Sequence, residues 1–158
     1  MNECSDKFQG FLGTQCVCNI CSARGDLKIN SSKSLSLEIA DVYIIDINSA
    51  IKAFCKEEFL GESEGWFCSV CGRQVISTKQ HSFLLLPRVL IVHLKRFVGL
   101  EKENKHISFE LLLDIEEQSW SIKYELVVGV IQHVSLVDNR SINVGHYNAY
   151  INSLIISI

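Results

Sequence analysis

The sequence predicts a mixed fold in which one helix accompanies a strand-rich second half. Two observations predict it. Residues 48–60 place apolar side chains at helical spacing, whereas the chain beyond Cys71 consists of the apolar and alternating segments typical of strands. With 158 residues, 47% of them hydrophobic, the chain is long enough for one sizeable core, which favours a single domain or part of a larger one.

The first half is expected to hold two strands. Residues 8–22 indicate a short strand that leads into a turn containing cysteines. Residues 34–39 (SLSLEI) alternate between apolar and polar side chains, which is the pattern of a half-buried strand.

The expected helix spans residues 48–60 (NSAIKAFCKEEFL). Asn48 or Ser49 can cap its N-terminus, and Gly61 can end it, because these residue types favour those helix ends. Its apolar face is expected to consist of Ile51, Phe54 and Cys55.

The second half is expected to form a β-sheet. Residues 89–92 are apolar without interruption, so their strand is expected to lie centrally and to be covered on both faces. One helix is too little to cover such a sheet, so we expect apolar sheet surface to remain open to water. The segments that predict strands are FLLL before Pro87, RVLIVHLKRF, ISFELLL, YELVVGVIQHV and HYNAYI.

Composition argues against several classes of protein. Lys plus Arg number 15 and Asp plus Glu number 18, a net charge of −3, so no positive field is available to bind nucleic acid. No apolar stretch is long enough for a membrane span, and the N-terminal residues MNECSDKFQG lack the apolar core of a signal peptide. We therefore expect a protein of the cytoplasm or nucleus that does not bind nucleic acid or membranes.

Two cysteine knuckles predict a metal site. Cys18-x2-Cys21 and Cys68-x2-Cys71 are matched pairs with 46 residues between Cys21 and Cys68. Each tight turn can direct two thiolates at one ion, and two turns complete the tetrahedral four-sulfur shell that Zn²⁺ accepts. Such a closed shell leaves no open coordination position, so the ion is expected to be structural.

Other interpretations of the seven cysteines are weaker. A disulfide framework is disfavoured because the count is odd and no secretory signal is present. Four ordinary buried thiols or a dithiol redox centre do not explain two matched pairs. Cys16 remains an alternative to Cys18 as a ligand, whereas Cys55, on the helix, and Cys4, near the terminus, are expected to be bystanders.

Several segments, in a fixed order, resemble the ubiquitin-specific protease (ubiquitin carboxyl-terminal hydrolase) family. They are FQG with the first knuckle, EEFLGE, WFCSVC, LPRVLIVHLKRF and YELVVGVIQHV followed by VGHYNAYI. The resemblance covers most of residues 8–151. It implies a partial papain-like α+β cysteine protease fold, with zinc-bearing fingers at about 8–86, an antiparallel β palm at about 87–151, and no thumb.

The resemblance also implies an activity. In this family a cysteine thiolate attacks the isopeptide bond after ubiquitin's C-terminal glycine, and a histidine takes the thiol proton and later protonates the leaving amine. The match assigns that histidine to His146, and it places Gly145 and Tyr147 beside the cleft for ubiquitin's C-terminal tail. Ubiquitin or ubiquitinated proteins are the implied partners.

The chain departs from the family pattern at both ends. It has no counterpart of the family's nucleophile box. In the family the Asp or Asn that orients the histidine follows a tryptophan, and the 12 residues after His146 contain no tryptophan. Cys16, in GFLGTQC, has a passing likeness to the nucleophile box, but it runs directly into a metal knuckle. We therefore expect the chain alone to be inactive, as a fragment of a deubiquitinating enzyme; the alternative is a catalytically inactive ubiquitin-binding or scaffold module.

Overall fold

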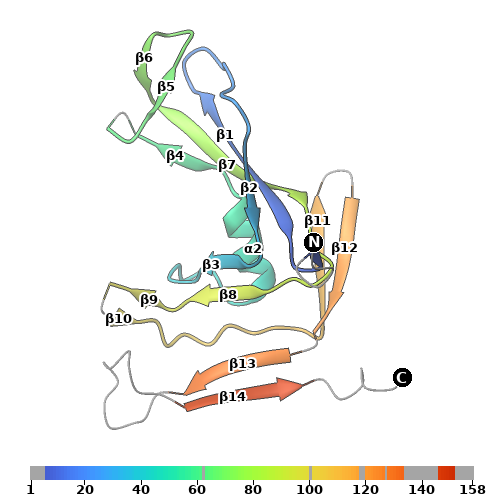
Figure 1. Cartoon of the computed structure of the whole chain (residues 1–158). Helices are drawn as coiled ribbons and strands as arrows, with labels where there is room; N and C mark the ends of the chain where they lie inside the picture. Colours follow the sequence, from blue (N-terminus) through green and yellow to red (C-terminus); the bar gives the residue numbers. More distant parts are fainter. Residues whose placement is uncertain are drawn as a thin grey trace. The chain divides into compact units, whose positions relative to one another are not determined.

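The computed structural model describes residues 6–61, 63–99, 101–117, 120–126, 128–133 and 146–151 (Figure 1). The chain divides into two compact units. Unit 1 comprises Met1–Leu37 and Ile51–Leu94, and unit 2 comprises Glu38–Ala50 and Lys95–Ile158. Among the described residues, no helix combines the length and the apolar character that a membrane crossing requires.

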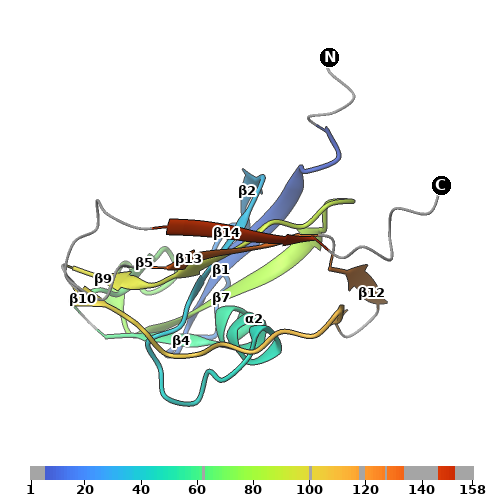
Figure 2. The ribbon, with the colours of Figure 1, turned by 90° about the horizontal axis from the view of Figure 1, so that it is seen from below.

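A four-stranded antiparallel sheet forms the centre of unit 1. Its strand order is β2-β1-β7-β4, and β2, β1 and β7 can be followed side by side in Figure 2. The long pair, β1 with β7, joins distant parts of the sequence, because Cys18 lies opposite Ser77 and Thr14 opposite His81. The strands span Gly10–Cys18 (β1), Lys28–Ser32 (β2), Glu58–Leu60 (β4) and Ser77–Leu85 (β7).

A hairpin lies where β1 ends. Strand β5 (Trp66–Cys68) pairs with β6 (Arg73–Val75), and only Ile76 separates β6 from the start of β7. Figure 1 shows this hairpin and the loop after β1 at the same end of the β1–β7 pair. The register of the sheet therefore sets the position of both cysteine knuckles.

Strand β3 (Leu35–Glu38) pairs with β8 (Val92–Lys95). Leu35 and Leu37 are buried, whereas Ser36 is half-buried and Glu38 is exposed. The alternation in residues 34–39 thus predicted both the strand and its buried face correctly. The strand predicted within residues 8–22 is also confirmed, as β1.

Helix α2 (Ile47–Cys55) is shorter than predicted. Its N-cap is Asp46, whose Oδ1 accepts a hydrogen bond from the Ser49 amide at 2.6 Å, while Ser49 Oγ accepts one from the Asp46 amide at 3.1 Å. This reciprocal pair is a capping box, so the cap predicted at Asn48 or Ser49 was wrong by two or three positions. Of the predicted apolar face, Ile51 is buried, and Phe54 and Cys55 are half-buried.

The predicted end of the helix at Gly61 was also wrong. Residues Glu58–Leu60 form β4 instead, opposite Ser77, Thr78 and Lys79 of β7. The Lys79 ammonium lies 2.6 Å from Glu58 Oε2 across this pair. Local helical spacing was overridden here because strand pairing with β7 satisfies the same backbone groups.

The expectation of a fully covered strand at residues 89–92 was wrong. Only Val92 of this run belongs to a strand, and β8 has one partner, β3, among the described residues. Val89 is 40% exposed and Ile91 is 45% exposed. The run follows the turn at Pro87 rather than crossing a sheet, so its apolar side chains do not all face protein.

Unit 2 consists of short antiparallel pairs rather than one continuous sheet in its described part. The pairs are β9 (Phe97–Val98) with β10 (Glu101–Lys102), β11 (Leu112–Glu117) with β12 (Trp120–Glu125), and β13 (Val128–His133) with β14 (His146–Ile151). Its buried apolar residues include Ile39, Ile44, Ala50, Ile107 and Ile115.

Unit 2 also exposes large apolar side chains, as the sequence predicts. Leu112 and Ile122, on β11 and β12, are 59% and 38% exposed. Val42, Tyr43 and Ile45, between β3 and α2, are exposed as well.

Candidate metal centre and histidine hairpin

The first knuckle, residues 18–22, reverses the chain at the end of β1. The Ser22 amide donates a hydrogen bond of 2.9 Å to the Cys18 carbonyl. Ser22 has a positive φ of 60°, which lets the chain turn tightly after Cys21. The turn brings Cys21 back towards Cys18.

The second knuckle, residues 68–72, has the same construction. The Gly72 amide donates a hydrogen bond of 2.8 Å to the Cys68 carbonyl, and Gly72 has a φ of 68°. Glycine adopts this left-handed conformation without the steric cost that a Cβ atom imposes. Both CxxC segments therefore close in the same way, with a left-handed residue directly after the second cysteine.

The sheet holds the two knuckles together. Cys18 is the last residue of β1 and lies opposite Ser77, while the Asn19 amide donates to the Ile76 carbonyl at 3.2 Å. Residues 16–25 form a first hairpin, in which Val17 lies opposite Arg24. Trp66 of the second hairpin, β5–β6, packs against it at Gly25, where a Cβ atom would lie 2.8 Å from the indole ring. A small core fills the space between the hairpins, formed by Cys18, Cys68 and Val75 with Ala23, Trp66 and Cys71.

The four predicted ligands meet in this core. The Sγ atoms of Cys18, Cys21, Cys68 and Cys71 all lie within 4.8 Å of one another. Across the knuckles, Cys21 Sγ lies 3.6 Å from Cys68 Sγ, and Cys18 Sγ lies 3.9 Å from Cys71 Sγ. A tetrahedral ion with Zn–S bonds of about 2.3 Å places its sulfurs about 3.8 Å apart, so the arrangement fits a four-thiolate metal site.

Cys16 lies outside this group. It occupies the interior of β1, opposite Lys79 of β7, and its side chain is half-buried. The geometry therefore favours Cys18 over Cys16 in the first knuckle. The same position, two residues before a metal knuckle, also argues against Cys16 as a nucleophile.

Hydrogen bonds to sulfur make the four thiols unequal. The amide of Cys21, together with that of Ile20, donates to Cys18 Sγ and lowers the pKa of Cys18 to about 6, although burial acts in the opposite direction. The neighbouring Cys21 side chain, followed by burial and by Cys68, raises the pKa of Cys71 to about 12. Without a cation the cluster thus resists full ionisation, whereas a bound divalent ion stabilises all four thiolates.

The histidine that the resemblance singles out begins a strand. His146 is the first residue of β14, and its backbone lies opposite His133 of β13. Tyr147 follows it and lies opposite Gln132. Gly145 lies outside the described residues, so its expected place beside a cleft stays a prediction.

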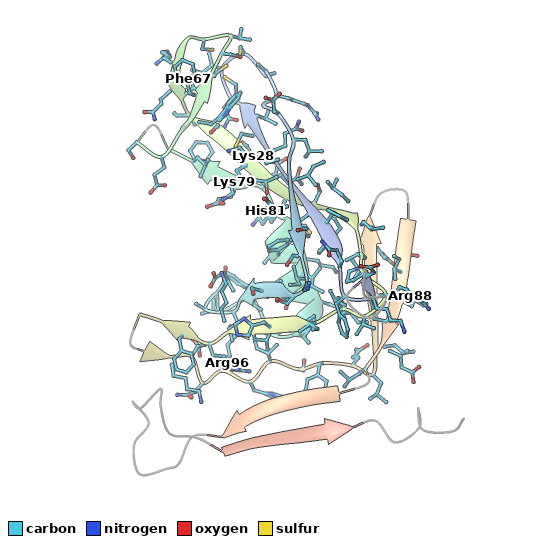
Figure 3. All side chains as sticks on the ribbon, in the orientation of Figure 1. Lys28, Phe67, Lys79, His81, Arg88 and Arg96 are labelled. Carbon is cyan, nitrogen blue, oxygen red and sulfur yellow. The ribbon has the colours of Figure 1, made fainter. Side chains whose placement is uncertain are left out.

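One histidine of unit 1 lies in a setting that sequence reasoning did not single out. His81 Nδ1 lies 2.9 Å from Thr14 Oγ1, and its ring stacks on Phe54 with centroids 4.9 Å apart. Lys79 lies two residues earlier on β7, and Figure 3 labels both side chains. Burial, then the Lys79 charge, lowers the pKa of His81, and Glu58 opposes this shift. The signal in the sequence was the alternation of β7, which puts Lys79, His81 and Phe83 on one face.

Comparisons with known proteins agree with this architecture. The model of the ubiquitin carboxyl-terminal hydrolase family matches residues 2–154. Ubiquitin carboxyl-terminal hydrolase 4 of Eremothecium gossypii is 28% identical over 169 residues, covering 93% of this chain and 19% of the relative. Ubiquitin carboxyl-terminal hydrolase 4 of Saccharomyces cerevisiae is 36% identical over 114 residues, covering 70% of this chain and 12% of the relative. The chain thus spans about a fifth or less of the length of these relatives.

Solved structures give the same result. A chain in the SAGA Ubp8/Sgf11/Sus1/Sgf73 DUB module bound to ubiquitin aldehyde superposes with a TM-score of 0.75 at 27% identity, covering 91% of this chain and 33% of that one. A chain of the yeast SAGA DUBm gives a TM-score of 0.77 at 28% identity with the same coverage.

The predicted fold is confirmed by these structures. It is a partial cysteine protease fold of the ubiquitin-specific type, in which antiparallel sheets accompany helix α2 and the four-cysteine cluster fits the fingers. The resemblance recognised in the sequence is confirmed as well, because the family match covers nearly the whole chain. The chain belongs to the ubiquitin carboxyl-terminal hydrolase family of cysteine proteases.

Proposed function

We propose that this chain functions in deubiquitination, as the fingers-and-palm part of an enzyme that hydrolyses the isopeptide bond after ubiquitin's C-terminal glycine. The family match over residues 2–154 is the observation that carries this proposal. A relative in the solved structures is bound to ubiquitin aldehyde, which supports ubiquitin as the partner of this chain. In this assignment the fingers span about 8–86 and the palm about 87–151, and the protein acts in the cytoplasm or nucleus.

His146 is proposed as the catalytic base. Its imidazole takes the proton of a cysteine thiol, which makes the thiolate that attacks the carbonyl, and then donates this proton to the departing lysine amine. Its place as the first residue of β14 supports this role, because catalytic residues often lie at the termini of the elements that position them. Gly145 and Tyr147 are proposed to border the passage for ubiquitin's C-terminal tail, where a glycine lets a threaded peptide approach the backbone closely.

The metal site is proposed to hold one structural Zn²⁺ on Cys18, Cys21, Cys68 and Cys71. The fit of the four Sγ atoms to a tetrahedral shell supports this. Because four protein thiolates fill the shell, the ion would stabilise the two hairpins and take no part in hydrolysis. Cys18 and Cys68 belong to the small core between those hairpins, so folding there depends on metal.

The isolated 158-residue chain is proposed to be inactive. A histidine needs a neighbouring thiolate for covalent catalysis, and the resemblance assigns no nucleophilic cysteine and no orienting Asp or Asn to these residues. The alternative, a catalytically inactive ubiquitin-binding module, gives the same result with the isolated chain. The two possibilities therefore have to be separated in a protein that also contains a nucleophile.

A chimera tests the proposal. The 158 residues replace the matching segment of the Eremothecium gossypii ubiquitin carboxyl-terminal hydrolase 4, which covers 93% of this chain, and hydrolysis of a fluorogenic ubiquitin substrate is followed. We expect turnover by the chimera, a loss of at least about 1,000-fold in kcat with His146→Ala, and no turnover by the isolated chain. Binding of labelled ubiquitin, measured in parallel, should survive the His146→Ala substitution.

The control is His133→Ala, which removes the histidine opposite His146 on the neighbouring strand. It should retain most of the turnover. Full activity of the His146→Ala chimera would remove His146 from the mechanism. A chimera that binds ubiquitin but never turns it over would favour the inactive module.

A further inference from the structure

The four cysteines of the metal cluster differ in their access to solvent. Cys18 is 1% exposed and Cys68 is 0% exposed, so both first cysteines of the knuckles are closed off. Cys71 is half-buried, and Cys21 is exposed. Cys21 is therefore the most exposed residue of the cluster, Cys71 is intermediate, and Cys18 and Cys68 are shielded by protein.

Hydrogen bonds fix the buried sulfurs more firmly than burial alone would. Cys18 Sγ accepts the amides of Ile20 and Cys21, each at 3.4 Å, and Cys68 Sγ accepts the amide of Cys71 at 3.5 Å. These bonds tie the first sulfur of each knuckle to its own turn. The exposed sulfur of Cys21 lies 3.6 Å from the buried Cys68 Sγ, in the other knuckle.

We propose that Cys21 is an oxidative modification site, at which a peroxide displaces the ion by joining Cys21 to Cys68. The proposal rests on the zinc site proposed above. Thiolates that bind a metal are already deprotonated, so exposure decides which of the four a small oxidant attacks first. Exposure selects Cys21, and Cys68 Sγ, 3.6 Å away in the other knuckle, is close enough to be its partner.

The chemistry balances in two steps. The Cys21 thiolate attacks one oxygen of hydrogen peroxide, an S–O bond forms, the O–O bond breaks, and hydroxide leaves. The Cys68 thiolate then attacks the sulfur of the Cys21 sulfenic acid, an S–S bond forms, and a second hydroxide leaves. Two thiolates have been oxidised, one peroxide has been reduced, and two protons from solvent turn both hydroxides into water.

Geometry permits the second step. A disulfide needs sulfurs about 2.05 Å apart, so Cys21 Sγ and Cys68 Sγ have to approach by about 1.5 Å. Rotation of the Cys21 side chain at the surface can supply this movement. With two of four ligands removed, Cys18 and Cys71 alone no longer form a four-sulfur shell, and the ion is released.

Matched substitutions test the assignment. Cys21→His and Cys71→His each leave three cysteines and a histidine, a ligand set that Zn²⁺ also accepts. Zinc released by hydrogen peroxide is measured with a chromogenic chelator in the full 158-residue chain and both variants. Cysteine pairing is mapped by mass spectrometry. Zinc content before treatment shows that each variant has folded around its ion.

We expect the wild-type chain and Cys71→His to lose zinc at similar rates, and Cys21→His to lose it at least about fivefold more slowly. The released wild-type protein should contain a Cys21–Cys68 disulfide. Equal rates in the two variants, or a disulfide that leaves out Cys21, would overturn the proposal. A chain purified without zinc would refute the metal site itself, and none of these results depends on ubiquitin hydrolysis.

Discussion

At the scale of single residues, the cluster works as a set rather than as four independent thiols. Cys18 has a pKa lowered to about 6 by amide hydrogen bonds, whereas the neighbouring Cys21 side chain raises the pKa of Cys71 to about 12. The lowered pKa of Cys18 favours its thiolate, whereas the raised pKa of Cys71 opposes the deprotonation of all four thiols. A divalent cation resolves this conflict, because its charge stabilises every thiolate that it binds.

Substitution of Cys18 and of Cys16 should separate the two candidate ligands. Cys18→Ser is expected to lower bound zinc from about one ion per chain to about a tenth of that, because a four-thiolate shell loses a corner. Cys16→Ser is the matched control, two residues away and outside the cluster, and should retain full zinc content. Atomic emission of the purified proteins gives the measurement. The reverse result would assign the ligand to Cys16.

His81 should make stability depend on pH. Its pKa is lowered in the folded state, so between that value and the unfolded value of about 6.5 the unfolded chain binds more protons. The stabilising contribution is therefore complete above about pH 6.5 and is lost as the pH falls through the folded pKa. Urea midpoints at several pH values should fall on acidification, and less steeply for His81→Phe, which keeps a ring beside Phe54. Equal slopes would contradict this role.

At the scale of elements, both knuckles depend on a left-handed residue after the second cysteine. Gly72 has a φ of 68° and Ser22 a φ of 60°. Glycine meets this demand in one knuckle, whereas in the other a serine adopts a conformation that is uncommon for residues with a side chain. The second knuckle is therefore the more sensitive to substitution of its left-handed residue.

Gly72→Ala should destabilise unit 1 by about 1 to 2 kcal/mol, since a Cβ atom disfavours the left-handed conformation. Gly61→Ala is the control, because a Cβ atom there meets no atom within 4 Å and no positive φ is required. Chemical denaturation of both variants gives the comparison. If the two variants have equal midpoints, the turn does not depend on glycine.

The capping box of α2 gives a second comparison. Asp46→Ala removes the oxygen that accepts the Ser49 amide and should reduce the free energy of unfolding by about 1 kcal/mol. Asn48→Ala, at a position where the sequence suggested the cap, should change it by less than about 0.5 kcal/mol. Thermal unfolding of the two variants distinguishes them. A larger loss of unfolding free energy with Asn48→Ala than with Asp46→Ala would indicate that Asn48 is the N-cap.

The sequence predicted elements well where one local rule decided the outcome. The CxxC spacing identified the four clustered sulfurs, and the alternation in SLSLEI identified β3 with its buried leucines. Prediction from the sequence failed where contacts with a distant segment determined the structure. Residues 58–60 continue a helical pattern but pair with β7, and Val89 and Ile91 are apolar yet exposed. His81 was missed because its neighbours, Thr14 and Phe54, lie far away in the sequence.

At the scale of the whole molecule, the two compact units are held in different ways. Unit 1 combines a four-stranded sheet with the proposed ion, whereas the described part of unit 2 consists of two-stranded pairs and has no four-cysteine cluster. Metal removal should therefore affect the units unequally. Hydrogen exchange measures this difference at individual backbone amides.

Treatment with a strong chelator should remove hydrogen-exchange protection at residues 16–25 and 66–75, since their hairpins share the ion. The β11–β12 pair, Leu112–Glu117 with Trp120–Glu125, should keep its exchange rates. Restoring zinc should restore protection. Simultaneous loss of protection in both units would mean that the chain unfolds as one cooperative body.

The pairing of β1 with β7 also imposes a delay during synthesis on the ribosome. Thr14 and His81, which are hydrogen-bonded across the two strands, are 67 positions apart. At about 5 to 20 residues per second, β1 waits about 3 to 13 s before its partner strand is made. During that interval the nascent chain carries Cys18 and Cys21 without their counterparts. During synthesis these two thiols are therefore open to mispairing and oxidation until β7 has been made.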